Sequence, residues 1–306
     1  MDVTFWGVRG SIPTPGYDTA RYGGNTLCIE IAPEGCGRTL VIDAGSGIRS
    51  LGNDLITRSG WTEGAARVDL FLSHTHLDHI LGLPFFRPFY HPSTRAVIYG
   101  PVISAADSLE QVIGGQLSYR YFPVRQVELS AEIRYVDLTE GDIEVGDGIR
   151  VGATYLNHPL LCMGYRVEQG GKIVCTAFDT EPFHNIFTSD PTDPGYDEQM
   201  ALEGERAARE AEERLTRFFS GADLLIYDGQ FTAAEYRAGR AGWGHSAIEH
   251  AVAAAEKSGA RRLALVHHDP MRSDEELDEL ARIHGGFRPG DGPEVIFARE
   301  GLRLTL

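Results

Sequence analysis

The chain has 306 residues, 42% of them hydrophobic, which is enough to bury a substantial core. Its 44 acidic and 28 basic residues give a formal net charge of -16, and this charge repels a long polyanion. Long RNA or DNA is therefore excluded as an expected partner, whereas a small anionic substrate held by metal ions is not.

No targeting or membrane segment is predicted. The N-terminal stretch MDVTFWGVRGSIPTPG lacks the basic and long apolar regions of a secretory signal, and no apolar run approaches the ~20 residues that cross a bilayer. We expect a cytoplasmic protein with no membrane partner. The four cysteines show no CxxC spacing and are expected to be reduced, mostly buried side chains: Cys28, Cys36, Cys162 and Cys175.

The first half of the chain is rich in predicted strands. Segment 47–59 has the pattern of a helix, a second helix is predicted near 105–113, and the GG pair at 170–171 indicates a hairpin turn. An apolar, proline-containing run covers 83–90. Strand-like runs lie at 3–8, 26–31, 39–43, 68–73, 96–100, 132–138, 149–158, 162–168 and 172–179.

The second half begins with a long loop at 182–200, rich in Pro, Asp and Gly, which is interpreted either as a flap beside Asp179 or as a plain surface excursion. A charged amphipathic helix is predicted over 201–221. Strands and helices then alternate to the end of the chain. With no repeat or linker in view, the sequence predicts one α/β domain over 1–306, with sheets inside and helices outside.

The sequence SHTHLDH at 73–79 follows an apolar strand directly. Alternate side chains of an extended segment point the same way, so His74 and His76 can reach one cation, while Asp78 and His79 can turn toward a second. A polar loop of hydrogen-bonded histidines is the alternative. The number of required positions in HxHxDH favours a site for two metal ions.

Further ligands are expected where later strands end. His158, Asp179 and His267 each stand at such a position, the usual place for a side chain held by a rigid scaffold. His268 is the alternative to His267 as the last ligand, and spacing alone does not decide between them. The N/O donor set without cysteine suits two divalent ions, with Zn²⁺ preferred and Mn²⁺ or Fe²⁺ accommodated.

The motifs GVRGSIPTPG, VIDAGSG, SHTHLDH, FDT, ADLLIYDGQF and GHSAIEHAVAAAEKSGARRLALVHH resemble the metallo-β-lactamase-fold hydrolases, in the branch of ribonuclease Z and small phosphodiesterases. The resemblance implies an αββα sandwich of two mixed sheets flanked by helices, and homodimerisation. It also implies that Asp43 steadies the ligand loop by hydrogen bonding. The implied ligands are His74, His76 and His158 for one metal, Asp78, His79 and His267 for the other, and Asp179 bridging both.

His245 is the candidate residue whose role distinguishes a phosphodiesterase from a lactone or thioester hydrolase. Ser246 and Glu249 fit a capping box, which would place His245 before a helix N-terminus where an anion is favoured and where the dipole would lower the imidazole pKa. The resemblance indicates that His245 contacts the scissile phosphate. We expect it to protonate the leaving alkoxide, and we count Asp78 with it as catalytic. A histidine merely packed at the helix approach is the alternative.

These features predict a dinuclear metal-dependent hydrolase that uses metal-bound hydroxide. The expected substrate is a small phosphodiester, such as a cyclic nucleotide or a cyclic sugar phosphate. Residues 80–157 contain no Gly/Pro-rich basic arm of the kind that tRNA-processing relatives carry, which with the net charge argues against tRNA. The alternatives are a lactone or thioester hydrolase of the same fold and a non-catalytic metal-dependent sensor. Gly10 and Ser11 either present backbone N–H groups to a substrate or only form a turn.

Overall fold

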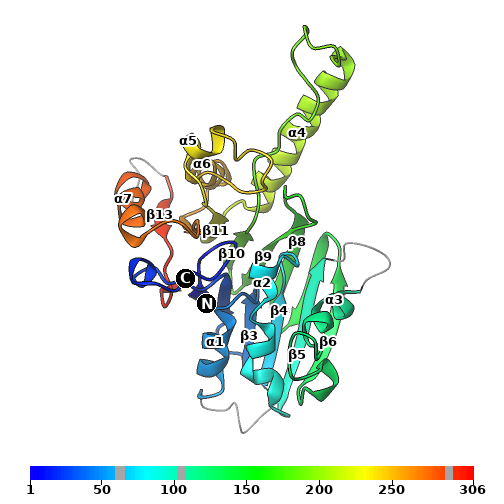
Figure 1. Ribbon diagram of the computed structural model, residues 1–306, viewed down its shortest axis with the longest axis vertical. Coiled ribbons are helices and arrows are strands. Elements are labelled where there is room, and N and C mark those ends of the chain that lie inside the picture. The colour runs from blue at the N-terminus through cyan, green and yellow to red at the C-terminus, as the bar shows by residue number, and fades with distance from the viewer. Residues whose placement is uncertain (59–65, 102–107, 287–291) are drawn as a thin grey trace.

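The computed structural model describes residues 1–58, 66–101, 108–286 and 292–306. Two seven-stranded sheets stack against each other, and helices cover their outer faces (Figure 1). This is the predicted αββα sandwich.

The first sheet is mixed. Antiparallel strands from both ends of the chain form one side, and parallel strands form the other. In spatial order it contains β14 (Arg303–Thr305), β1 (Asp2–Gly7), β2 (Cys28–Ala32), β3 (Arg38–Ile42), β4 (Ala66–Phe71), β5 (Thr94–Pro101) and β6 (Glu132–Leu138).

The second sheet has the same mixed character, with β10 to β13 parallel and the other pairs antiparallel. In spatial order it contains β13 (Glu294–Phe297), β12 (Arg262–Val266), β11 (Leu224–Asp228), β10 (Lys172–Ala177), β9 (Met163–Gln169), β8 (Ile149–Tyr155) and β7 (Gly141–Gly146).

Three apolar layers hold the sandwich together. The central one joins the inner faces of the two sheets, for example Phe5 and Ile29 with Val151 and Val174, all without exposed surface. A second layer packs the first sheet against helices α1 (Ile48–Leu55) and α3 (Leu109–Gln116). The third packs the second sheet against α4 (Glu198–Phe218), α6 (Ile248–Ser258) and α7 (Asp274–His284). Burial of these apolar faces is the main force that positions the strand ends.

Most predicted elements are present. The GG hairpin has the expected register, with Gln169 opposite Lys172, and all four cysteines are free. Segment 83–90 forms two short 3-10 turns, because Pro84 and Pro88 lack the N–H that a strand or helix interior needs. Strand β7 was not predicted. Position 59 of the first predicted helix and 105–107 of the second lie outside the described residues.

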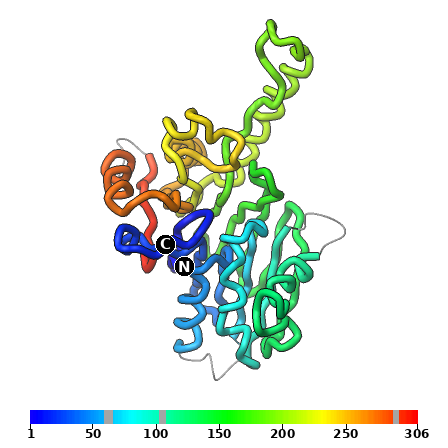
Figure 2. The backbone as a smooth tube through the Cα atoms, in the orientation of Figure 1, coloured from blue at the N-terminus to red at the C-terminus, as the bar shows by residue number. Residues whose placement is uncertain are grey.

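The charged helix begins at Glu198, three residues earlier than predicted, with Asp197 as its N-cap. Residues 182–197 form a loop whose Asn185 donates to the carbonyl oxygen of Ala201 on this helix. Together the loop and α4 project from the body (Figures 1 and 2). The loop therefore runs out along α4 and does not cover Asp179 as a flap.

None of the helices in the described ranges is both long and apolar enough to pass through a bilayer.

Candidate metal centre

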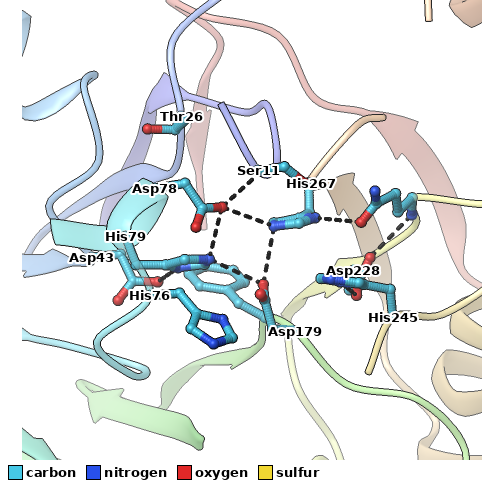
Figure 3. Close-up of polar contacts among 12 residues, drawn as sticks. Ser11, Thr26, Asp43, His76, Asp78, His79, Asp179, Asp228, His245 and His267 are labelled. Carbon is cyan, nitrogen blue, oxygen red and sulfur yellow. Dashed lines mark hydrogen bonds and ion pairs between the residues drawn. The ribbon is translucent and has the colours of Figure 1, made fainter. Parts of the chain in front are cut away.

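The candidate ligands converge at one edge of the two sheets. His74 and His76 follow β4, the short helix α2 (Leu77–Ile80) carries Asp78 and His79, and Asp179 follows β10. His76, Asp78, His79 and Asp179 meet in one cluster, with His267 opposite His79 (Figure 3). His74 joins it through Asp179.

The first group of ligand atoms belongs to His74, His76, His158 and Asp179, and these atoms all lie within 4.8 Å of one another. His76 Nδ1 is 3.2 Å from His158 Nε2, and His74 Nε2 is 3.5 Å from Asp179 Oδ2. A tetrahedral zinc with bonds of ~2.0–2.1 Å separates its ligand atoms by roughly 3.3 Å. Both separations are close to that value.

The second group consists of Asp78, His79 and His267, again with Asp179. His79 Nε2 is 3.3 Å from Asp78 Oδ2 and 3.2 Å from Asp179 Oδ1. His267 Nε2 is 3.4 Å from the same Asp78 oxygen and 3.2 Å from the same Asp179 oxygen. Four atoms therefore have the spacing of one tetrahedral ligand set.

Asp179 belongs to both groups through different oxygens, Oδ2 toward His74 and Oδ1 toward His79 and His267. It is 2% exposed, and its Oδ1 has no hydrogen-bond partner. The Nε2 atoms of His74, His79 and His267 are likewise buried without a hydrogen-bond donor or acceptor. Because unpaired buried polar atoms are costly, and because the donors are imidazoles and carboxylates, the cluster fits a pair of divalent metal ions.

Backbone strain concentrates at this edge. Asp43, Asp179 and His267 have φ of 60°, 46° and 59°, a left-handed conformation that residues other than glycine rarely adopt. Ser11 has φ of 63°, and its N–H donates to Asp78 Oδ2 at 2.7 Å. Such strain persists only where the surrounding structure enforces it, and it is typical of functional sites.

Asp43 organises two of the imidazoles. It is fully buried and accepts hydrogen bonds from Ser73 N at 2.6 Å, Ser73 Oγ at 2.8 Å and His79 Nδ1 at 2.7 Å. Since the Ser73 hydroxyl donates to Asp43, its oxygen accepts from His74 Nδ1, 3.1 Å away. Both histidines then carry their proton on Nδ1 and turn an unprotonated Nε2 toward the cluster, as metal binding requires.

Two further imidazoles are oriented in the same manner. His158 Nδ1 is 3.0 Å from the carbonyl oxygen of Gly244, and His267 Nδ1 is 3.1 Å from Gln230 Oε1. His268 lies elsewhere, because its Nε2 donates to the carbonyl oxygen of Ala298 and burial lowers its pKa to about 3. The structure thus places His267, not His268, beside the other candidate ligands.

The charge within the cluster is strongly coupled. Burial lowers the pKa of His79, but the carboxylates of Asp179, Asp78 and Asp43 outweigh burial and raise that pKa well above the ordinary value. For Asp179, burial raises the carboxyl pKa, and the surrounding histidines, His267 first, bring it well below the usual range. A bound metal ion would take the place of the extra proton on His79, because only a neutral imidazole can be a ligand, so metal binding is expected to release protons.

His245 lies beside the cluster, with its ring stacked on His267 at 4.7 Å between centroids. Its Nδ1 is 3.0 Å from Oδ2 of the fully buried Asp228 (Figure 3). Burial lowers the pKa of His245, yet Asp228 and Asp179 raise it to about 9. The lowering expected from a helix dipole is therefore wrong, because the charges of the two carboxylates and the hydrogen bond to Asp228 raise the pKa.

The predicted capping box at Ser246 is also wrong. Ser246 Oγ donates to the carbonyl oxygen of Thr180 at 2.7 Å, and Glu249 accepts from the N–H of Ala233. Helix α6 starts one residue later than a Ser246 cap requires, with Ala247 as its N-cap. Ser246 thus ties the His245 segment to the loop that carries Asp179.

Sequence reasoning missed Ser73, Asp228 and Gln230, which orient His74, His245 and His267. One signal could have found Asp228: it ends a parallel strand, as Asp179 and His267 nearly do. The carboxyl ends of neighbouring parallel strands meet at one edge of a sheet.

The sandwich and the seven converging side chains have the arrangement of a metallo-β-lactamase-fold hydrolase, and the comparisons with known proteins agree with this class. Residues 38–189 match the model of the β-lactamase superfamily domain. The chain is 28% identical to the ribonuclease Z of Haloarcula marismortui, over 99% of this chain and 96% of that protein.

Two solved structures share the fold. Human tRNase Z, short form, has a TM-score of 0.61 and 19% identity, covering 100% of this chain and 99% of its own. The metallo-β-lactamase-fold protein YhfI of Bacillus subtilis also has a TM-score of 0.61 and 19% identity, covering 99% of this chain and 98% of its own. The predictions of fold, family and metal-dependent hydrolase are confirmed.

The exclusion of long nucleic acid as a partner is wrong, because the relatives that match this chain are ribonucleases. The error lies in using the net charge of the whole chain to predict the electrostatic field at one binding surface. Binding of a phosphate backbone depends on the field where contact occurs, and metal ions or a few arginines can reverse the field of an acidic chain at that place.

Proposed function

We propose that this protein is a dinuclear metal-dependent phosphodiesterase. The observation that carries the proposal is the pair of ligand groups sharing Asp179, in which imidazole nitrogens lie 3.2–3.5 Å from carboxylate oxygens or, for His76 and His158, from each other. Zn²⁺ is the preferred ion for this donor set. Two such ions would activate a water and neutralise the charge that develops on a phosphoryl oxygen.

His74, His76 and His158 would hold one ion, Asp78, His79 and His267 the other, and Asp179 both. Asp43 directs the ring proton of His79 to Nδ1 directly and that of His74 through Ser73, which leaves Nε2 of each neutral ring for the ion. The cluster is buried on one side and open on the other: His74, His79, Asp179 and His267 are each at most 2% exposed, whereas His158 is half-buried and His76 is exposed. The buried ligands form a fixed base for the ions, and the side at His76 leaves room for water and substrate to enter.

His245 is proposed to move the proton. Its Nδ1–H donates to Asp228, which fixes the ring and supports a second proton on Nε2. Nε2 would donate to a phosphoryl oxygen and then pass its proton to the leaving alkoxide. A carboxylic ester hydrolase could do without this group, so the Asp228–His245 pair supports the phosphodiester over a lactone or thioester.

Two sizes of substrate fit the proposal. A small cyclic phosphodiester is the one expected from the sequence, and the ribonuclease relatives make an RNA phosphodiester the other. The ligand cluster acts on the scissile phosphate alone and is indifferent to what the phosphate joins.

The test is a panel of substrates for the zinc-loaded protein: a cyclic nucleotide, bis(p-nitrophenyl) phosphate, an RNA with a 3′ extension and a lactone. His245→Ala should lower turnover of the cyclic nucleotide and of the RNA, whose leaving alkoxides need a proton, at least tenfold with unchanged zinc content, and His250→Ala, outside the cluster, should not. Full activity of His245→Ala would refute the role of His245 as the general acid. Turnover of the lactone alone, or of nothing despite tight zinc binding, would favour the ester hydrolase or the sensor.

A further inference from the structure

A short loop of unusual composition lies against the candidate centre. Residues 238–244, AGRAGWG, are called the rim loop here; Arg240 is its sole ionisable side chain and Trp243 its sole aromatic one. Gly239, Gly242 and Gly244 all have positive φ, between 82° and 118°. Glycine is needed for such a backbone.

Contacts at both ends fix the rim loop to the site. The carbonyl oxygen of Gly244 accepts a hydrogen bond from His158 Nδ1. A Cβ on Gly244 would lie 2.2 Å from the same Nδ1, so only glycine fits there. The buried Glu181 accepts from the N–H of Gly242 and from the hydroxyl of Tyr236, each at 2.8 Å. Glu181 stands two positions after Asp179, so the rim loop is held by one candidate ligand, His158, and by a close sequence neighbour of another, Asp179.

Within this frame, the Arg240 guanidinium contacts two aromatic rings. Its Cζ is 4.4 Å from the centroid of Trp243 and 5.8 Å from that of Phe231. Phe231 is buried and faces His245 edge-on at 6.2 Å. A series of rings and one guanidinium thus leads from His245 outward to Trp243.

The outer end of this series is open. Trp243 is 55% exposed although it is the largest apolar side chain of the loop. Arg240 makes no ion pair with any residue in the described ranges, and the nearby Glu235 is already paired with Arg272 at 2.8 Å. An exposed indole beside a guanidinium without an ion-pair partner offers a ring face and a positive charge, the two features that a planar, anionic ligand can use.

We propose that Trp243 and Arg240 form a subsite that stacks the nucleobase of a nucleotide phosphodiester while its phosphate occupies the metal centre. This proposal rests on the proposed function, and it names the substrate class of that site. Stacking of a base on an aromatic ring tolerates any sequence, and its loss costs roughly 5- to 150-fold in affinity. The subsite therefore sets a preference for nucleotides without choosing among bases.

Two phosphodiesters with the same leaving group test the subsite, the p-nitrophenyl esters of thymidine monophosphate and of methyl phosphate. In the zinc-loaded protein, Trp243→Ala should lower kcat/KM for the thymidine ester about tenfold, through KM, and leave the methyl ester unchanged. Trp243→Phe should restore most of the loss. Tyr121→Ala, which removes another exposed aromatic side chain away from the rim loop, is the control. Equal losses on both esters, or no loss on the thymidine ester, would overturn the subsite.

Failure of the proposed function gives a different result, since the unmodified protein would then hydrolyse neither ester. In that case quenching of tryptophan fluorescence by thymidine monophosphate tests whether the subsite binds a base. Quenching that disappears in Trp243→Phe would support base stacking without turnover, whereas quenching of the same size in that variant, or none in the unmodified protein, would overturn it.

Discussion

Replacement of Asp43 by asparagine should weaken metal binding, although Asp43 is not itself one of the proposed ligands. Oδ2 of Asp43 accepts from both Ser73 Oγ and His79 Nδ1, and an amide NH₂ in its place would face two donors. His79 would have to move its proton to Nε2, the atom that faces Asp78 and Asp179. Loss of such a partner typically costs 10- to 100-fold in metal affinity, about 1.4–2.7 kcal/mol.

The assay is a zinc titration against a competing chelator, with thermal unfolding recorded separately. Asp69→Asn is the matched control, because Asp69 is also buried, lies on the neighbouring strand β4 and pairs with Arg38 away from the cluster. Asp69→Asn should lower stability and leave zinc affinity intact. If Asp43→Asn binds both zinc ions with the affinity of the unmodified protein, the argument that Asp43 sets the tautomers is refuted.

Three other predictions follow from the same contacts. A Cβ on Gly10 would lie 2.2 Å from the His267 ring, so Gly10→Ala should lower the zinc content, measured by elemental analysis, from two ions to one per chain. Gly16→Ala, whose Cβ would make an ordinary contact at 3.5 Å, is the control and should keep two. Asp228→Asn should reduce phosphodiester turnover by about tenfold or more with zinc content unchanged; unchanged kcat would show that Asp228 does not act through His245. Removal of zinc by a chelator should lower Tm, because ions at 1,000 times their Kd stabilise by ~4 kcal/mol, and an unchanged Tm would argue against ions at this buried cluster.

The four ligands of the SHTHLDH motif could be predicted because their spacing is local. His74, His76, Asp78 and His79 lie within six consecutive positions after a buried strand, so the turn that follows β4 brings them together by itself. The later ligands were expected from a simple rule, that a polar residue at the end of a buried strand lies at the sheet edge.

The supporting residues could not be predicted in this way. Gln230 meets His267 and Asp228 meets His245 only because parallel strands β11 and β12 lie side by side, a pairing that no local pattern encodes. Ser246 looks like a helix cap in the sequence, yet its hydroxyl is taken by Thr180 from a distant loop. Local propensity gave way to tertiary contacts at both places.

Strand β7 escaped prediction for another reason. Its sequence GDIEVG is mostly exposed and lies at the edge of the second sheet, so it lacks the apolar pattern of a buried strand.

The central claim is most directly tested by phosphodiester turnover of the metal-free protein as zinc is added in known equivalents. The account predicts that turnover of bis(p-nitrophenyl) phosphate rises until two equivalents per chain are bound and then stays level, and that Asp179→Ala shows no such rise. Full turnover at one equivalent, or no turnover with two zinc ions bound, would contradict it.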